Sequence, residues 1–298
     1  MNKNNRENPS MTALMSCFVK AYHHENSFIK VYDDFLSKKL LSADEYYRIA
    51  QSLKDGIAFF NPAFDGTPDD ALEYIVNTHL GPSVLGRSAF TEKSLETAAK
   101  LGVNQYLIFA SGYDTSGCKF PDMQVFELDK SQMITDKIRR LEGCNISTSN
   151  VSYVKSDFTN SLWKDALEIS GYDGHLRAFC SLLGISYYLS AEEFIHFIED
   201  VSSVLATGST IVFDYPVENG SFSENLKEKM AKGADEEMLS KYSYGDIEKM
   251  LENADMLIYE HLEASDIEHQ YFATYNSCSR RYPLVAPKDV SYCLAVKR

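Results

Sequence analysis

The sequence predicts an α/β fold built on a doubly wound, mainly parallel sheet of seven strands, with a helical N-terminal extension and an antiparallel C-terminal edge. Five short apolar segments alternate with amphipathic helical patterns, which is typical of a parallel sheet covered on both faces. Glycines close several helical segments, as expected for the residue that follows a helix. The C-terminal part of the chain then departs from this rhythm.

The N-terminal region has the pattern of a helical extension. The first ten residues are polar, and the pattern from Met11 to about Ser83 is helical. Ser42-Ala43-Asp44-Glu45 is a capping box ahead of one of these helices. We therefore predict an extension or cap over residues 1–86, followed by the core over 87–298. Such a region suits a cap over a pocket, and it equally suits packing on the edge of the sheet.

Short apolar runs define the parallel strands. The first run is broken by Gly112, and its apolar character throughout predicts a central strand buried on both faces. A capping box that begins at Ser190 opens one of the helices between the strands. The expected strands cover residues 105–111, 124–129, 151–157, 178–183 and 210–215. The expected helices cover residues 88–101, 130–142, 163–170 and 190–205.

The C-terminal segment adds further elements to this core. A charged helical insertion is expected at about 218–240, followed by a helix at 243–254. Two apolar segments at 257–264 and 291–297 read as strands with a long connection between them. A closing pair of strands fits an antiparallel edge added to a parallel sheet.

Composition and charge argue against several classes of protein. The 298 residues are 44% apolar and 24% charged, as in a globular chain, and no apolar run is long enough to span a bilayer. A net charge of −14 without a basic cluster argues against nucleic acid as a partner. The six cysteines form no Cys-x-x-Cys pair and no zinc-type spacing. We expect reduced thiols, no bound metal, and a cytoplasmic protein that does not act at a membrane.

Polar turns follow three successive strands, at the edge where ligands bind in open α/β sheets. Gly112 lies in the first turn, Asp129 ends the second strand, and Asp157 ends the third. A carboxylate at Asp129 can accept hydrogen bonds from ribose hydroxyls, and Asp157 can bond to an adenine amino group with Phe158 against the ring. An ordinary tight turn and two helix-capping acids remain the alternative reading. The G-x-G-x-x-G fingerprint of dinucleotide binding is absent.

The order and spacing of these motifs resemble the leucine carboxyl methyltransferase family, which includes bacterial polyketide-type O-methyltransferases. The resemblance covers roughly residues 87–215 and implies the Rossmann-like fold of class I S-adenosylmethionine-dependent methyltransferases. The matching positions are Ala110-Ser111-Gly112-Tyr113-Asp114-Thr115, Glu127-Leu128-Asp129, Asp157, Trp163, Ala166-Leu167, Gly171-Tyr172-Asp173, Gly184, Tyr188-Leu189 and Asp214.

The resemblance also implies a set of cofactor contacts. Arg87 matches an arginine that meets the carboxylate of the methionine part of the cofactor. Leu183 stands where the family often has a glutamate that contacts the cofactor, and Ala110 stands where the family usually has glycine. The implied cofactor is S-adenosyl-L-methionine, and the implied binding residues are Arg87, Ala110, Ser111, Gly112, Asp129, Asp157, Phe158 and Leu183.

The predicted activity is transfer of a methyl group to a carboxylate or hydroxyl of a small metabolite. A carboxylate needs no general base, whereas a hydroxyl does. His79, His261 and His269 lie in no diagnostic motif, so no catalytic residue is assigned. Substrate-lining candidates are Tyr271, Tyr275 and Arg280.

Two other functions stay open at this level, as do the methyl acceptor and the oligomeric state. A non-catalytic member that binds only cofactor or a partner is one alternative, because Leu183 replaces the family glutamate. A nicotinamide-dependent oxidoreductase is the less favoured alternative, because it requires the glycine fingerprint that this chain lacks.

Overall fold

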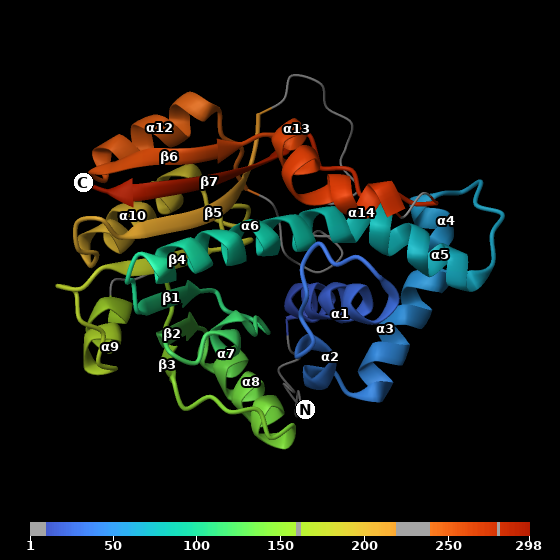
Figure 1. Cartoon of the computed structure of the whole chain (residues 1–298), viewed down its shortest axis with the longest axis horizontal. Coiled ribbons are helices and arrows are strands. Elements are labelled where there is room, and N and C mark those ends of the chain that lie inside the picture. The colour runs from blue at the N-terminus through green and yellow to red at the C-terminus, as the bar shows by residue number, and fades with distance from the viewer. Residues whose placement is uncertain (1–9, 159–161, 219–238, 279–280) are drawn as a thin grey trace, which may run out of the picture.

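The computed structural model describes residues 10–158, 162–218, 239–278 and 281–298, and its centre is one seven-stranded sheet (Figure 1). The strand order is β3-β2-β1-β4-β5-β7-β6. Strands β1 to β5 pair in parallel, whereas β7 pairs antiparallel with both β5 and β6. The predicted fold class is therefore confirmed. The strands are β1 (Gln105–Phe109), β2 (Gln124–Asp129), β3 (Val151–Lys155), β4 (Ala178–Leu182), β5 (Thr210–Pro216), β6 (Met256–Leu262) and β7 (Val290–Lys297).

Both faces of the sheet are covered by a hydrophobic core. Successive side chains of a strand point to opposite faces, so neighbouring residues of a strand enter different cores. Along β1, Tyr106 and Ile108 belong to one hydrophobic core, and Leu107 and Phe109 belong to the other. All five residues of β1 are buried. This explains why the strand reads as a continuous apolar run and not as an alternating one.

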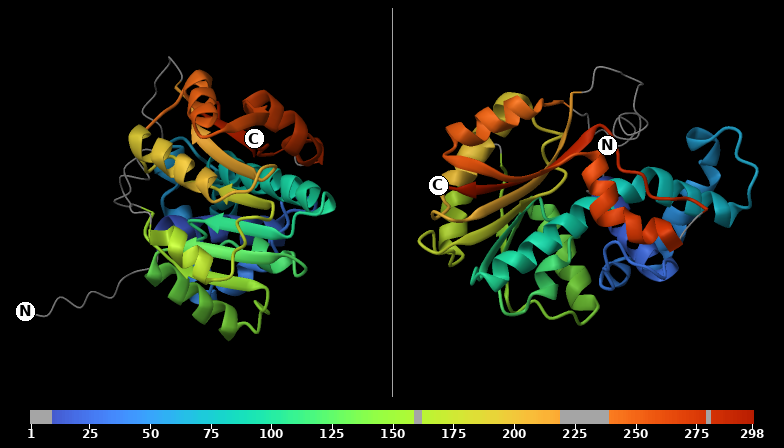
Figure 2. Two further views of the ribbon diagram at one scale, coloured as in Figure 1. Left: turned by 90° about the vertical axis from the view of Figure 1, so that its left-hand side faces the viewer. Right: turned by 45° about the horizontal axis from the view of Figure 1, so that its top comes forward.

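Helices cover the two faces in separate layers (Figure 2). The core with Tyr106 and Ile108 includes the N-terminal helices and α6. The core with Leu107 and Phe109 includes α9, α10 and α12. The described helices between β1 and β6 are α7 (Ser116–Lys119), α8 (Ser131–Gly143), α9 (Leu162–Ile169), α10 (Ala191–Ser203) and α12 (Tyr244–Asn253).

The N-terminal extension is helical, as predicted, and it packs into the same core as the sheet. The long helix α6 (Gly81–Lys100) crosses the molecule and passes through residues 86 and 87 without a break (Figure 1). The expected start of this helix at residue 88 is wrong, because Pro82 occupies the first turn, where proline is tolerated. The division at residue 86 stays a prediction. The other elements are α1 (Met11–Asn26), α2 (Ser37–Leu40), α3 (Ala43–Asp55), α4 (Ile57–Phe60), α5 (Pro68–Ile75) and the π-helix η1 (Val76–Leu80).

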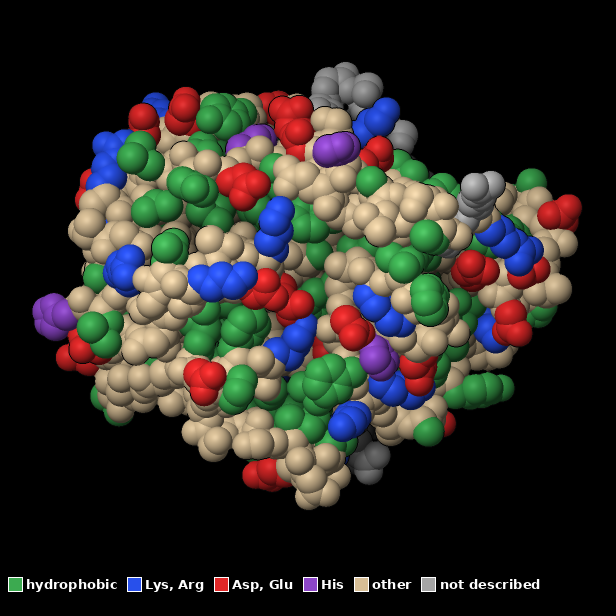
Figure 3. Space-filling model, viewed as in Figure 1, with side chains coloured by type: hydrophobic (Ala, Val, Ile, Leu, Met, Phe, Trp, Pro, Cys, Tyr) green, Lys and Arg blue, Asp and Glu red, His purple; other side chains and the backbone are tan. Residues whose placement is uncertain are grey.

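The long connection between the last two strands is helical. It comprises α13 (Ala264–Ile267), the π-helix η2 (Glu268–Phe272) and α14 (Ala273–Cys278). The helical insertion predicted at about 218–240 lies almost wholly outside the described residues. No helix in the described ranges is long and apolar enough to cross a membrane. On the face drawn in Figure 3, Lys and Arg side chains are interspersed with Asp and Glu.

Candidate cofactor site

A cavity of about 660 Å³ lies at the carboxyl ends of the parallel strands. The strand order reverses between β1 and β4, which is where ligands bind in open α/β sheets. The structure brings all the predicted cofactor contacts together in its lining. These residues are Arg87, Ala110, Ser111, Gly112, Asp129, Asp157, Phe158 and Leu183.

The turn after β1 forms the floor of the cavity and has an unusual backbone. Gly112 has φ +48° and Ala110 has φ +49°, both in the left-handed region. A Cβ atom at Gly112 would lie 3.3 Å from Cβ of Ala13 on α1. The glycine therefore permits both the left-handed turn and the close approach of α1.

The carboxylate of Asp129 is held firmly beside this turn. Its Oδ2 accepts the backbone N–H of Gly112 at 2.7 Å, and its Oδ1 accepts the N–H of Lys130 at 2.7 Å. Burial raises the pKa of Asp129, and the two backbone hydrogen bonds oppose that shift. Since an ionised carboxylate has about four acceptor positions, two remain for hydroxyl groups of a ligand.

Asp157 and Phe158 follow β3 and line the cavity. Asp157 is exposed, whereas Phe158 is partly buried. The ring of Phe158 lies 5.6 Å from that of Phe109 and 5.4 Å from that of Phe197, measured between centroids. This packing fixes an aromatic surface beside an acidic side chain, which suits a flat polar ring.

Arg87 on α6 also lines the cavity. Its Nη1 donates to Oδ2 of Asp214 at 3.1 Å. The Asp214 carboxylate is 1% exposed, and it also accepts the N–H of Gly184 at 2.7 Å and the hydroxyl of Tyr187 at 2.9 Å. Burial opposes the charge of Arg87, but Asp214 outweighs burial and raises its pKa. The guanidinium therefore stays charged at the cavity wall. Leu183, just before Gly184, lines the same wall with an aliphatic side chain.

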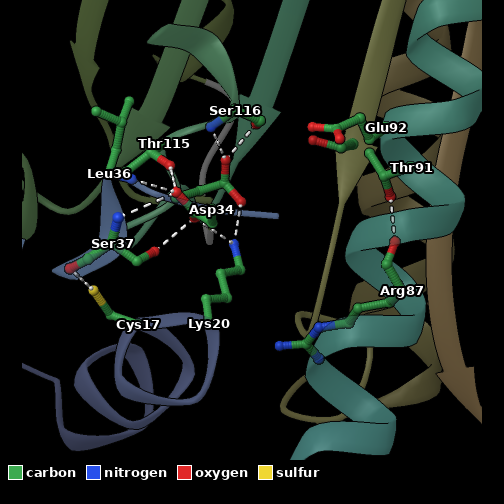
Figure 4. A network of polar contacts seen from close by, with 12 residues as sticks. Cys17, Lys20, Asp34, Leu36, Ser37, Arg87, Thr91, Glu92, Thr115 and Ser116 are labelled. Carbon is green, nitrogen blue, oxygen red and sulfur yellow. Dashed lines mark hydrogen bonds and ion pairs between the residues drawn. The ribbon is translucent and has the colours of Figure 1, made fainter. Parts of the chain in front are cut away.

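Helix α1 forms a wall of the cavity that the sequence did not identify. Lys20 on α1 is buried, and its Nζ lies 2.9 Å from Oδ2 of Asp114 and 4.0 Å from Oδ2 of Asp34. Thr115, beside Asp114, donates its hydroxyl to Asp34 at 2.6 Å. Figure 4 shows Asp34 at the centre of these contacts, with Ser37 and Lys20 directed toward it. The network ties the N-terminal helices to the turn after β1.

The Asp114 carboxylate is ionised within this network. Burial alone would raise its pKa, but the charges of Lys20 and Lys137 and hydrogen bonds from Ser116 outweigh it and lower the pKa. Burial also opposes the charge of Lys20, and Asp114 and Asp34 reverse that effect and raise its pKa. The pair is thus a charged one inside the cavity wall.

Part of the lining that the sequence analysis missed lies on α1, far in the chain from the strand ends. Lys20 and Asp114 are separated by 94 residues, and no local pattern links them. The Tyr113-Asp114-Thr115 motif drew attention to Asp114, but nothing in the sequence drew attention to its partner Lys20. The other lining residues outside the prediction include Ala13, Cys17, Ser88, Met133, Ile185 and Glu193.

Two of the three predicted substrate-lining residues lie elsewhere in the fold. Tyr271 and Tyr275 lie on η2 and α14 and do not line this cavity, and Arg280 lies outside the described residues. The three histidines considered as possible bases are also absent from its lining. His79 packs against Phe60 and Tyr74, His261 bonds to Tyr215, and His269 lies on η2.

The lining as a whole fits a cationic nucleoside. The volume falls within the range of ligand pockets, about 300–1,000 Å³. Acidic side chains at Asp114, Asp129, Asp157 and Glu193 outnumber the cations Lys20, Arg87 and Lys130. The part of the chain that the structure describes holds no group of three or more His, Cys, Asp or Glu that could bind a metal ion.

Comparison with known proteins agrees with this geometry. A Bacillus subtilis protein named "Putative S-adenosyl-L-methionine-dependent methyltransferase YktD" is 33% identical over 304 residues, covering 97% of this chain and 98% of that protein. A Mycobacterium tuberculosis protein named "Putative S-adenosyl-L-methionine-dependent methyltransferase" is 29% identical over 132 residues, covering 43% of this chain and 42% of that protein.

Solved structures share the fold. A DUF574 family protein from Streptomyces avermitilis has a TM-score of 0.60 at 12% identity and covers 97% of this chain and 98% of its own. A "putative methyltransferase" from Thermobifida fusca has a TM-score of 0.57 at 14% identity, and the match covers 99% of this chain and 97% of that chain. The family model for leucine carboxyl methyltransferase matches residues 13–202. This chain therefore belongs to the leucine carboxyl methyltransferase family of S-adenosyl-L-methionine-dependent methyltransferases.

Proposed function

We propose that the protein is an O-methyltransferase whose acceptor is a small metabolite, and that the acceptor atom is a carboxylate oxygen rather than a hydroxyl oxygen. The observation that carries this choice is the lack of a free base among the described residues of the cavity lining. No histidine lines the cavity. A hydroxyl acceptor requires a base to take its proton, and a carboxylate does not.

The acids of the lining are engaged in other contacts. Asp114 is paired with Lys20, and Asp129 accepts two backbone N–H groups. Glu193 accepts the backbone N–H of Ser190 as part of a helix cap, and Asp157 also makes a polar contact. These roles leave the acids suited to holding ligand groups and unsuited to removing protons.

The cofactor is held, in this proposal, by the eight residues predicted from the sequence. Asp129 takes the ribose hydroxyls, Asp157 and Phe158 take the adenine ring, and Arg87 takes the carboxylate of the methionine part. The turn at Ala110, Ser111 and Gly112 approaches the ligand through its backbone. S-adenosylmethionine supplies an electrophilic methyl group on a sulfonium and is released as S-adenosylhomocysteine.

The protein's own contribution is to bind and orient the two reactants. Methyl transfer is an in-line displacement, so its rate depends mainly on the distance and alignment of the acceptor oxygen. The aliphatic side chains of Leu183, Ile185 and Leu189 line the cavity and suit an acceptor with an apolar body.

Calorimetric titration tests the cofactor site. We expect S-adenosylhomocysteine to bind and NAD and NADP to give no heat. Asp129→Ala should abolish the heat of S-adenosylhomocysteine binding while the circular dichroism spectrum stays unchanged. The matched control is Asp122→Ala, at a position outside the cavity lining, which should bind like the wild type. Unchanged affinity in Asp129→Ala would show that the ribose contact lies elsewhere.

The acceptor is tested by transfer of labelled methyl groups from S-adenosylmethionine. A methyl ester releases methanol in mild alkali, whereas a methyl ether does not. We expect alkali-labile product from a panel of small carboxylic acids and none from matched alcohols and phenols. Product formed only on peptides that end in leucine would replace the small metabolite with a protein C-terminus.

A non-catalytic role has one supporting observation, the aliphatic Leu183 at the position where the family often has glutamate. It predicts cofactor binding without transfer to any acceptor of the panel. Leu183→Glu is the informative variant, because gain of transfer in it would assign the missing activity to this position.

A further inference from the structure

Arg87 is held in place by residues that lie outside the cofactor cavity. Its side chain lines the cavity and is 18% exposed. Asp214 and Tyr187 are 1% and 8% exposed, and neither belongs to the lining. Any effect of these two residues on a bound ligand must therefore pass through a neighbour that does line the cavity.

The Asp214 carboxylate is fixed by the turn after β4 as well as by Arg87. Its Oδ1 accepts the N–H of Gly184 at 2.7 Å, and its Oδ2 accepts the hydroxyl of Tyr187 at 2.9 Å and Nη1 of Arg87 at 3.1 Å. The hydroxyl of Ser186 donates to the backbone carbonyl of Asp214 at 2.7 Å. Burial and the charge of Asp214 raise the pKa of Tyr187, so its hydroxyl keeps its proton and donates. The position of the carboxylate therefore does not depend on Arg87 alone.

The guanidinium lies directly against the backbone of Gly184. A Cβ atom at this position would be 2.9 Å from Nη1, 3.2 Å from Nη2 and 3.3 Å from Cζ of Arg87. All three distances are shorter than a comfortable non-bonded contact, which is about 3.5–4.0 Å between carbon atoms. Since Gly184 also has φ +70°, a side chain here would be strained and would displace the guanidinium.

These contacts leave most donors of Arg87 to a ligand. A guanidinium carries five N–H donors in a rigid, planar fork. Within the described ranges, the Arg87 side chain donates only from Nη1, and only to Asp214. A planar fork binds a carboxylate best when its orientation is already set, because less freedom is then lost on binding.

We propose that Asp214 and Tyr187 are positioning residues, which orient Arg87 to bind the carboxylate of the cofactor's methionine part. They thereby set the preference of the cavity for a ligand that carries this carboxylate over one that lacks it. This role rests on the proposed function, in which Arg87 meets that carboxylate. Asp214 also competes with the ligand for the charge of Arg87. Orientation outweighs this competition, because a long side chain without support would lose its rotamer freedom on binding.

Two ligands that differ only in this carboxylate test the role. They are S-adenosylhomocysteine and its decarboxylated form, which keeps the ammonium group. Calorimetry on the full chain measures both affinities. In the wild type we expect S-adenosylhomocysteine to bind about tenfold more tightly, and we expect Arg87→Met to bind the two equally. A wild type that binds neither ligand would refute the cofactor site itself. Equal wild-type affinities would refute the contact at Arg87, and with it the support by Asp214, but not the cofactor site.

Tyr187→Phe and Asp214→Asn test the support, and both nearly keep the size of the side chain. S-adenosylhomocysteine should bind about fivefold more weakly to Tyr187→Phe and about tenfold more weakly to Asp214→Asn. The affinity for the decarboxylated ligand should stay unchanged in both, whereas a purely structural role would weaken both ligands together. Tyr187→Phe carries the test if Asp214→Asn fails to fold, because Asp214 then keeps its donors at Gly184 and Arg87.

Tyr215→Phe is the matched control. It removes the hydroxyl of another buried tyrosine, which lies 2.7 Å from Nε2 of His261 and outside the cavity lining. Both ligands should bind to it as to the wild type. Equal losses for the two ligands in Tyr187→Phe, or wild-type S-adenosylhomocysteine affinity in that variant, would overturn the proposal. Tighter S-adenosylhomocysteine binding to Asp214→Asn would also overturn it, because Asp214 would then act as a competitor of the ligand.

Discussion

Asp214 on β5 holds Arg87 on α6 through an ion pair of 3.1 Å, and the carboxylate of this pair is 1% exposed. The same carboxylate accepts the N–H of Gly184 and the hydroxyl of Tyr187. One buried group therefore joins a strand, a helix and the turn after β4 at the cavity wall. Removing a single partner of a buried pair is strongly destabilising, because it leaves the other charge uncompensated.

Asp214→Ala should accordingly lower the free energy of unfolding by about 3 kcal/mol. Urea denaturation at pH 7 measures this loss. The control is Asp200→Ala, which removes the carboxylate of the ion pair between Lys164 and Asp200. Asp200 is more exposed than Asp214, so this variant should change the free energy of unfolding by less than about 1 kcal/mol. Equal effects of the two variants would show that burial of Asp214 confers no special role.

Lys20→Met should lower the free energy of unfolding by about 3 kcal/mol at pH 7, because it leaves Asp34 and Asp114 without their buried cation. The pKa of Asp114 is lowered from its ordinary value of 3.8. Its ion pair therefore stabilises the fold above that pH, and the stabilisation is lost as the pH falls further. The difference between wild type and variant should shrink in urea titrations below about pH 4.

Lys39→Met provides the control for Lys20, since Lys39 is exposed on the neighbouring helix α2. Its unfolding free energy should stay within about 0.5 kcal/mol of the wild type. A difference between Lys20→Met and wild type that does not change between pH 7 and pH 3 would contradict the assigned ionisation of Asp114.

Gly112→Ala should weaken S-adenosylhomocysteine binding about tenfold, equal to about 1.4 kcal/mol. The added methyl group would meet Cβ of Ala13 at 3.3 Å, and the φ of +48° disfavours a side chain. Both effects disturb the turn whose N–H bonds to Asp129. Calorimetry of the double variant Ala13→Gly/Gly112→Ala separates them. Recovery of affinity assigns the loss to crowding by α1, and no recovery assigns it to the backbone.

The strand ends could be predicted from the sequence because their signals are local. A buried strand such as 105–109 is a short apolar run, and the turn after it carries a glycine that its φ requires. The position of Asp129 follows from where its strand stops. Since the ends of parallel strands meet at one edge of the sheet, three local signals were enough to predict that Gly112, Asp129 and Asp157 line one cavity.

The α1 wall could not be predicted in the same way, because it depends on long-range packing. In the sequence Lys20 only interrupts an apolar stretch, and its partner Asp114 follows 94 residues later. Arg87 and Asp214 were both noted through the family resemblance, but no signal in the sequence indicated that these residues, 127 positions apart, form a pair. The helices between β6 and β7 were missed because their segments are short and one is a π-helix.

The last prediction concerns the contact between the N-terminal extension and the core. Glu45 on α3 receives two hydrogen bonds from the guanidinium of Arg140 on α8, at 2.7 and 2.8 Å. Arg140, with the hydrogen bonds from Ser42, lowers the pKa of Glu45 from 4.5 to about 2 against the opposing effect of burial. A carboxylate with a lowered pKa stabilises the fold above its ordinary pKa and loses this effect as the pH falls.

Glu45→Gln should therefore be less stable than the wild type by about 1 kcal/mol at pH 7, a value discounted for the partial exposure of Glu45. The difference should disappear between about pH 4.5 and pH 2, the window set by the two pKa values. Urea denaturation across this range measures it, with Glu252→Gln at an exposed position of α12 as the control. A constant difference at every pH would mean that Glu45 acts through packing and not through its charge.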